Sequence, residues 1–416
     1  MPQHPPAKYL WFVLPSMAMM LGWGLRGYIG GGPLGAMIPG AMTALALALL
    51  LELDEADTAL LAAFGAVGVG FGGQMTYGQT VGLAFKPETF WWALLGFLIK
   101  GAVWGFVGGA VMGAAVERRR LAWTPKFVWS GLGLMTAAVW IGWKLINEPK
   151  LIYFSNRLDK PRPEIWAGLL LGGLAFLAWM ARGEARKTMW AYALWGGLGG
   201  GIGFALGAWV QVAGRAATPG QDIDWWKMME FTFGLLLGLS YGIAAWQTRR
   251  SPGAPAEPQP NEPFWRVLIV AILLITIGIG IESLEAAKYN YSIAGAILLA
   301  ASLHAGMLAR QTAITITFCA FGLDLLENKP YLDAPGLVGV ILATAVIAWL
   351  VQRWRAALPL FLLLTVTATA DAFLKTYLPG KGGPTWLTQG IFAVSAVACV
   401  WLALRVRPVE GGSDRT

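Results

Sequence analysis

Lys100 is the clearest candidate for a functional residue, because it is a charged side chain inside an apolar segment. It lies near the centre of the apolar run 90–116, where placing a lysine in a bilayer costs about 2.5–3.5 kcal/mol. A charged side chain at such a depth normally faces a cavity or a charged partner. Glu230 lies inside another apolar run, 225–247, and we expect the two side chains to pair. The alternative is a buried ion pair that only holds two helices together.

Other polar side chains fall at a similar depth. Gln74 and Tyr77 are three residues apart in the apolar run 58–82, and residues at this spacing share one face of a helix. Gln211 occupies a related place in a later run, and Arg26 follows the first run of the chain. We therefore predict a polar pocket in the outer half of the membrane, lined by Arg26, Gln74, Tyr77, Lys100, Gln211 and Glu230.

A glycine-rich stretch surrounds Arg26. The sequence GWGLRGYIGGGPLGAMIPG, at 22–40, lies between two apolar runs, and glycine and proline both weaken helices. We expect a break at Gly31 and Gly32, after which the free N–H groups of the next helix and its positive dipole end face Arg26. Such a broken helix predicts an anion site. The alternative is a tight loop between packed helices, with Arg26 reaching the membrane interface.

Several familiar sites are excluded by what the sequence lacks. The matches to G-x-G-x-x-G at 22–27 and 68–73 follow no strand, so they are not dinucleotide fingerprints. The chain holds two histidines and two cysteines, too few and too scattered for a zinc site or a Ser-His-Asp triad. We expect no cofactor, no metal and no catalytic residue.

The elements that position these residues are apolar helices. Hydrophobic residues make up 56% of the 416 positions and charged residues 13%, and runs long enough to cross a bilayer recur along the whole chain. The expected fold is an all-α, polytopic integral membrane protein with about fourteen spans. They are predicted at 9–24, 35–53, 58–82, 90–116, 127–146, 164–181, 188–212, 225–247, 264–282, 289–309, 311–326, 335–352, 356–377 and 385–407.

The basic residues predict the orientation in the membrane. Six basic segments all fall on the same side of the membrane when the predicted spans are followed in order: 117–120, 182–187, 247–250, 310, 352–355 and 405–407. Short loops that carry Lys and Arg remain in the cytoplasm. Both termini are therefore expected in the cytoplasm, and the loop 147–163 outside. The same rule accounts for the net charge of +8, so the bilayer is the expected partner and nucleic acid is not.

The chain divides into two expected membrane domains. Residues 1–246 hold eight predicted helices, the proline-rich segment 247–263 reads as a cytoplasmic linker, and 264–416 hold six more. Segments 64–120 and 195–250 resemble each other, because each carries a tryptophan pair and ends on basic residues. We interpret them as parallel repeats; chance similarity between glycine-rich helices is the alternative.

Glycines four residues apart form stripes on the repeated helices, and small residues at this spacing allow close packing of membrane helices. The stripes are predicted to pack these helices together. They comprise Gly101, Gly105, Gly109 and Gly113; Gly199, Gly203 and Gly207; and Gly234, Gly238 and Gly242.

Asp371 is the charged residue of the second domain that lies deepest in a predicted span. Threonines precede it and Lys375 follows at i+4, a favourable spacing for an ion pair. A site for a proton or another coupling ion is one interpretation, and an ordinary Asp–Lys pair is the other.

These features favour a secondary transporter of a small polar, anionic solute in the cytoplasmic membrane. The reasons are the expected broken helix, the lysine inside the membrane and the internal repeat, together with the absence of a nucleotide-binding motif. One alternative is an integral-membrane transferase for a lipid-linked substrate, with the basic, aromatic loop 147–163 over its headgroup. Another is a non-catalytic scaffold. The oligomeric state is left open.

Overall fold

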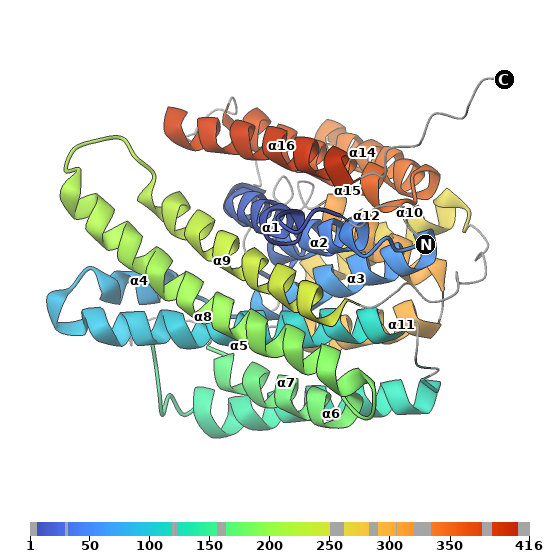
Figure 1. The fold of residues 1–416 in the computed structure, drawn as a ribbon, viewed down its shortest axis with the longest axis horizontal. Helices are drawn as coiled ribbons and strands as arrows, with labels where there is room; N and C mark the ends of the chain where they lie inside the picture. Colours follow the sequence, from blue (N-terminus) through green and yellow to red (C-terminus); the bar gives the residue numbers. More distant parts are fainter. Residues whose placement is uncertain are drawn as a thin grey trace.

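The computed structural model describes residues 6–29, 32–118, 121, 123–155, 164–249, 262–282, 290–304, 306–319, 334–376 and 385–406. Every secondary-structure element in these ranges is a helix, which confirms the all-α class. Figure 1 shows most of the helices lying roughly side by side.

The first part of the chain builds the centre and one side of the bundle (Figure 1). Its elements are α1 (Leu10–Ile29), α2 (Gly32–Leu50), α3 (Glu55–Gly72), α4 (Gly78–Ala84), η1 (Pro87–Thr89), α5 (Phe90–Arg118), α6 (Pro125–Gly142), η2 (Trp143–Asn147), α7 (Trp166–Met180), α8 (Ala185–Ala217) and α9 (Trp225–Thr248).

The second part packs onto α1, α2 and α3. Its elements are α10 (Phe264–Glu282), α11 (Asn290–His304), α12 (Met307–Phe318), α14 (Ala334–Arg353), α15 (Ala357–Thr376) and α16 (Trp386–Val406). The helices α15 and α16 lie against α1 and α2, while α11 and α12 lie against α3. The guanidinium of Arg310, on α12, donates to the carbonyl oxygen of Ala56 at 3.0 Å. The two predicted domains therefore share an interface.

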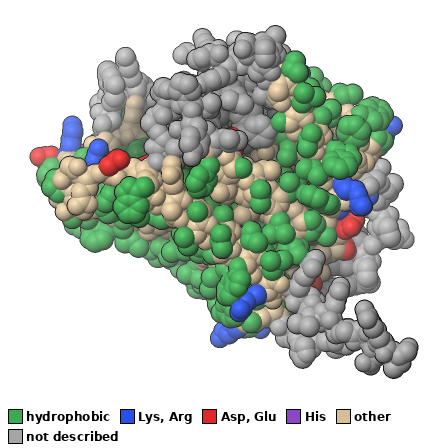
Figure 2. Space-filling model, turned by 90° about the horizontal axis from the view of Figure 1, so that it is seen from above, with side chains coloured by type: hydrophobic (Ala, Val, Ile, Leu, Met, Phe, Trp, Pro, Cys, Tyr) green, Lys and Arg blue, Asp and Glu red, His purple; other side chains and the backbone are tan. Residues whose placement is uncertain are grey.

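Five helical segments in the described ranges are long and apolar enough to cross a membrane. They are Gly32–Leu50, Pro87–Arg118, Ala185–Ala217, Trp225–Thr248 and Trp386–Val406. Large hydrophobic side chains are also exposed on the surface, Trp91 and Trp386 among them, and Figure 2 shows apolar side chains across most of the described face with charged ones near its margins. The apolar helices indicate a membrane-embedded helical protein.

Two of the glycine stripes hold α5, α8 and α9 together, as their spacing predicts, and the third packs α9 onto α1. A Cβ at Gly101 or Gly105 would run into the carbonyl oxygen of Gly200 or Gly196 on α8. The stripe at Gly199, Gly203 and Gly207 meets α9, and the stripe at Gly234, Gly238 and Gly242 meets α1. The helices α5 and α9 therefore pack on two faces of α8, and they also contact each other directly, because the hydroxyl of Tyr241 on α9 donates to the carbonyl oxygen of Gly105 on α5 at 2.8 Å.

Replacing a stripe glycine by alanine is expected to destabilise the fold. Gly105→Ala inserts a methyl group against the backbone of α8, and overpacking of this kind costs about 1–3 kcal/mol. Gly133 on α6 is the matched control, because no described atom lies within 4 Å of a Cβ placed there. Gly133→Ala should leave the unfolding temperature unchanged or raise it. Equal effects of the two substitutions on thermal unfolding in detergent would contradict this account of the packing.

The predicted continuous span at 58–82 is wrong. The helix α3 ends at Gly72 and α4 begins at Gly78, so residues 73–77 form a non-helical segment that we call the α3–α4 break. A Cβ at Gly72 would overlap the indole of Trp104, and one at Gly73 would lie 2.5 Å from the carbonyl oxygen of Gly32. Glycine permits both close approaches.

The first residues of α2 contact this break. Gly32 has a φ of +66°, which favours glycine, and Pro33 follows it in the first turn of α2, where a missing N–H is tolerated. Gly31, the other glycine of the predicted break, lies outside the described residues. The interruption that the sequence predicted between α1 and α2 therefore lies against a second one, between α3 and α4.

Candidate functional site

Arg26 lies at the centre of a buried polar cluster. It occupies the last turn of α1 and is 3% exposed. Its Nη1 donates to the hydroxyl of Tyr77, in the α3–α4 break, at 3.1 Å. That hydroxyl donates to Oε1 of Glu230 at 2.8 Å. The structure thus brings together three of the residues that the sequence predicted to share a pocket. We call Arg26, Tyr77, Lys227 and Glu230 the Arg26 cluster.

Helix α9 supplies the charged partners of the cluster. Lys227 lies one turn before Glu230, and its Nζ is 2.5 Å from Oε2 of that carboxylate. The indole of Trp226 donates to the other carboxylate oxygen at 3.0 Å. Asp224 starts this helix, because its side chain accepts from the backbone N–H of Lys227 at 3.1 Å, the usual role of an N-cap aspartate. The carboxylate of Glu230 is therefore fully engaged.

Aromatic rings surround the Arg26 guanidinium. The distances from its Cζ to the ring centroids are 5.3 Å for Trp23, 5.6 Å for Tyr77 and 5.1 Å for Trp104. Contacts of this kind stabilise a desolvated cation by about 2 kcal/mol or more. They do not accept hydrogen bonds in the plane of the guanidinium, however. Within the described part of the chain, Nε of Arg26 and Nε1 of Trp23 are buried donors that bond to nothing.

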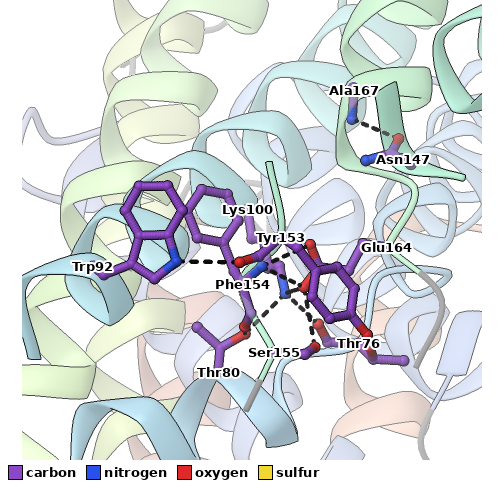
Figure 3. A network of polar contacts seen from close by, with 10 residues as sticks. All are labelled: Thr76, Thr80, Trp92, Lys100, Asn147, Tyr153, Phe154, Ser155, Glu164 and Ala167. Atoms are coloured by element: carbon purple, nitrogen blue, oxygen red, sulfur yellow. Dashed lines mark hydrogen bonds and ion pairs between the residues drawn. The ribbon is translucent and has the colours of Figure 1, made fainter. Parts of the chain in front are cut away.

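Lys100 belongs to a second cluster, on the face of α5 that meets α4 (Figure 3). Its Nζ is 2.8 Å from Oε1 of Glu164 and donates also to the hydroxyl of Thr80 and the carbonyl oxygen of Thr76, each at 2.8 Å. Lys100 and Glu164 are 1% and 0% exposed. The predicted Lys100–Glu230 pair is therefore wrong. Glu230 lies on α9, where its carboxylate pairs with Lys227 instead.

Glu164 holds the end of the predicted outer loop in place. Its carboxylate accepts from the backbone N–H of Phe154 at 3.1 Å and from the hydroxyl of Ser155 at 3.2 Å. The ring of Phe154 packs on Gly96, and Trp92 donates to the carbonyl oxygen of Tyr153 at 3.1 Å (Figure 3). This part of the loop is thus packed onto α5, and residues 156–163 lie outside the described ranges.

The two clusters adjoin along the α3–α4 break. Thr76 accepts from Lys100 and the next residue, Tyr77, donates to Glu230. Gln74 is buried in the same break, where its amide donates to the carbonyl oxygen of Phe71 at 3.1 Å. A change in the conformation of residues 73–77 would therefore act on both clusters.

No protein-family model, no curated protein and no solved structure matches this chain significantly.

The remaining predicted residues stand apart from these contacts. Gln211 is buried on α8, one turn beyond Gly207, and the described contacts include no hydrogen bond from its side chain to the Arg26 cluster. Asp371 lies half-buried on α15. Its predicted partner Lys375 has a side chain outside the described part of the structure, so the role in ion coupling stays a prediction. In the ranges that the structure describes, no group of histidine, cysteine or acidic residues could hold a metal.

The sequence analysis did not choose the two charged partners Lys227 and Glu164, nor the rings of Trp23 and Trp104 beside Arg26. The pairing of Lys227 with Glu230 could have been predicted. The two residues are three apart in an apolar run, and this spacing places both on one helix face. Glu164 is the first residue of an apolar run that follows a polar loop. Such a position predicts a residue at the membrane interface. Its burial depends on the packing of the loop onto α5.

Proposed function

We propose that this protein is a secondary transporter of a small polar, anionic solute, and that the Arg26 cluster binds the solute. The observation that carries the proposal is the balance of buried charge. Arg26 and Lys227 are 3% and 4% exposed, and Glu230 is fully buried between them. One positive charge is left over among these three side chains. An unpaired buried charge is costly, and an anion entering the cluster would neutralise it.

The position of the cluster supports transport. Broken helices that present polar groups inside a membrane protein are a common way of building transporter sites, and the Arg26 cluster lies where the α3–α4 break meets the end of α1. The break offers a part of the backbone that can move without unfolding a whole helix. We propose further that the protein lies in the cytoplasmic membrane with about fourteen spans, both termini inside, and that 64–120 and 195–250 are parallel repeats.

The test is ligand binding by the purified full-length chain. Differential scanning fluorimetry with organic acids, phosphates and sugar acids should reveal an anion that raises the unfolding temperature. Arg26→Ala should abolish this shift, because the excess positive charge and the hydrogen-bond donors are both lost. The same anion should accumulate in proteoliposomes that contain the wild-type protein.

Two results would overturn the proposal. One is a ligand-induced shift that survives in Arg26→Ala. The other is the absence of any shift with every anion tested, which would favour a scaffold. Lys144→Met is the matched control: it removes an exposed cation that pairs with Glu148 on the surface, and it should leave ligand binding unchanged.

A further inference from the structure

The free hydrogen-bond donors of Arg26 lie on one edge of its guanidinium. Nη1 is engaged by Tyr77, whereas Nε has no partner and the described contacts give none for Nη2. Nε–H and Nη2–H point the same way and form a fork. Their spacing matches the two oxygens of a carboxylate, which can then accept two parallel hydrogen bonds.

The surroundings favour an approach to this edge in the plane of the guanidinium. Rings of Trp23, Tyr77 and Trp104 lie within 5.6 Å of Cζ and occupy space that a stacked ligand would need. Trp23 adds a further buried N–H without a partner, three residues before Arg26 and so on the same side of α1. The unpartnered polar atoms at this place are all hydrogen-bond donors. They therefore fit a ligand that only accepts hydrogen bonds.

Charge and packing restrict the ligand further. The surplus among Arg26, Lys227 and Glu230 is one positive charge, which one negative charge balances. Packing beside the arginine is tight, because a Cβ on Gly24 would overlap Phe231, and one on Gly27 would overlap Nζ of Lys227 and lie 2.9 Å from Oε2 of Glu230. A bulky or doubly charged anion fits this environment less well than a small one with a single charge.

We propose that the ligand of the Arg26 cluster is a small monocarboxylate, bound side-on by Nε and Nη2 of Arg26. This inference rests on the proposed anion site and narrows its ligand to one chemical class. The arginine supplies two parallel hydrogen bonds and the neutralising charge, and the indole N–H of Trp23 is available to a carboxylate oxygen. The ligand displaces no hydrogen bond of the cluster, since both arginine donors are unpartnered.

The experiment compares anions of different shape on the full-length protein in a neutral detergent. Isothermal titration calorimetry with acetate and propionate should give saturable binding. Acetamide, which has the shape of acetate without its charge, should bind at least tenfold more weakly. Inorganic phosphate and sulfate, which are tetrahedral, should also bind more weakly. The affinity for decanoate should exceed that for acetate by no more than its apolar chain contributes through partition into the detergent.

Two variants test the geometry. Arg26→Lys keeps the charge and removes the fork, so acetate affinity should fall by about 10- to 100-fold, the worth of one hydrogen bond to a charged group. Trp23→Phe keeps a ring beside Arg26 and removes one N–H, and a loss of several-fold is expected. Thermal unfolding without ligand identifies any variant that fails to fold, and Trp23→Phe then carries the test alone.

The outcomes separate this inference from the proposed function. Tight binding of phosphate with no binding of acetate would overturn the carboxylate assignment and leave the anion transporter standing. Acetate binding that is unchanged in both Arg26→Lys and Trp23→Phe would overturn the side-on geometry. Binding of decanoate without acetate would overturn the small ligand in favour of a lipid carboxylate. Failure of every anion to bind would remove the inference and the proposed function together.

Discussion

Lys100→Met is expected to destabilise the protein by about 3–5 kcal/mol, because it leaves the buried carboxylate of Glu164 without its cation. Glu164→Gln should cost a comparable amount by stranding the ammonium group. Both side chains are almost completely buried, and Lys100 also ties the α3–α4 break to α5 through Thr76 and ties α4 to α5 through Thr80. Chemical unfolding in detergent, followed by tryptophan fluorescence, measures the loss.

The double variant Lys100→Met, Glu164→Gln gives the coupling between the two side chains. Removing both charges together should be milder than the sum of the single effects. The control is the exposed pair Lys144–Glu148, whose nitrogen and oxygen are 2.7 Å apart and whose side chains are 42% and 44% exposed. Lys144→Met should cost less than about 1 kcal/mol, as surface pairs generally do. Strict additivity in the Lys100–Glu164 cycle would show that the buried pair does not act as one.

The helices and their packing follow from the sequence where local composition decides the outcome. Apolar runs long enough to span a bilayer become helices, and glycines four apart place α8 directly against α5 and α9. The α3–α4 break was missed because its cause is not local. Gly72 and Gly73 are needed where the Trp104 indole and the turn at Gly32 approach, and neither contact can be read from the segment alone.

The site was predicted in part for the same reason. Arg26, Tyr77 and Glu230 could be chosen because polar residues in apolar runs are costly and must find partners. Their partners depend on which helices are neighbours. The predicted repeats put Lys100 and Glu230 at comparable depths, but depth in a predicted span does not determine which side chains face each other.

If the Arg26 cluster binds an anion as proposed, stability and ligand binding are expected to respond in opposite directions to one substitution. Glu230→Gln removes the negative charge and keeps an oxygen that can accept from Tyr77 and Trp226. Arg26 and Lys227 then lie buried without a carboxylate, so the unfolding temperature of the free protein should drop, by an amount equivalent to about 3–5 kcal/mol. An anion should now bind more tightly, because the surplus that attracts it rises from one positive charge to two.

Lys227→Met is the reverse substitution in the same pair, and it tests the charge balance directly. It leaves Arg26 and Glu230 as one positive and one negative charge, so the driving force for anion entry is lost and acetate should bind at least tenfold more weakly. The double variant Lys227→Met, Glu230→Gln restores a surplus of one positive charge at Arg26. It should therefore regain affinity close to that of the wild type, with a smaller loss of stability than Glu230→Gln alone. Calorimetric titration and thermal unfolding of the four proteins give both quantities. If affinity instead followed stability across the set, the charge balance would not govern binding, and the Arg26 cluster would be an element of packing.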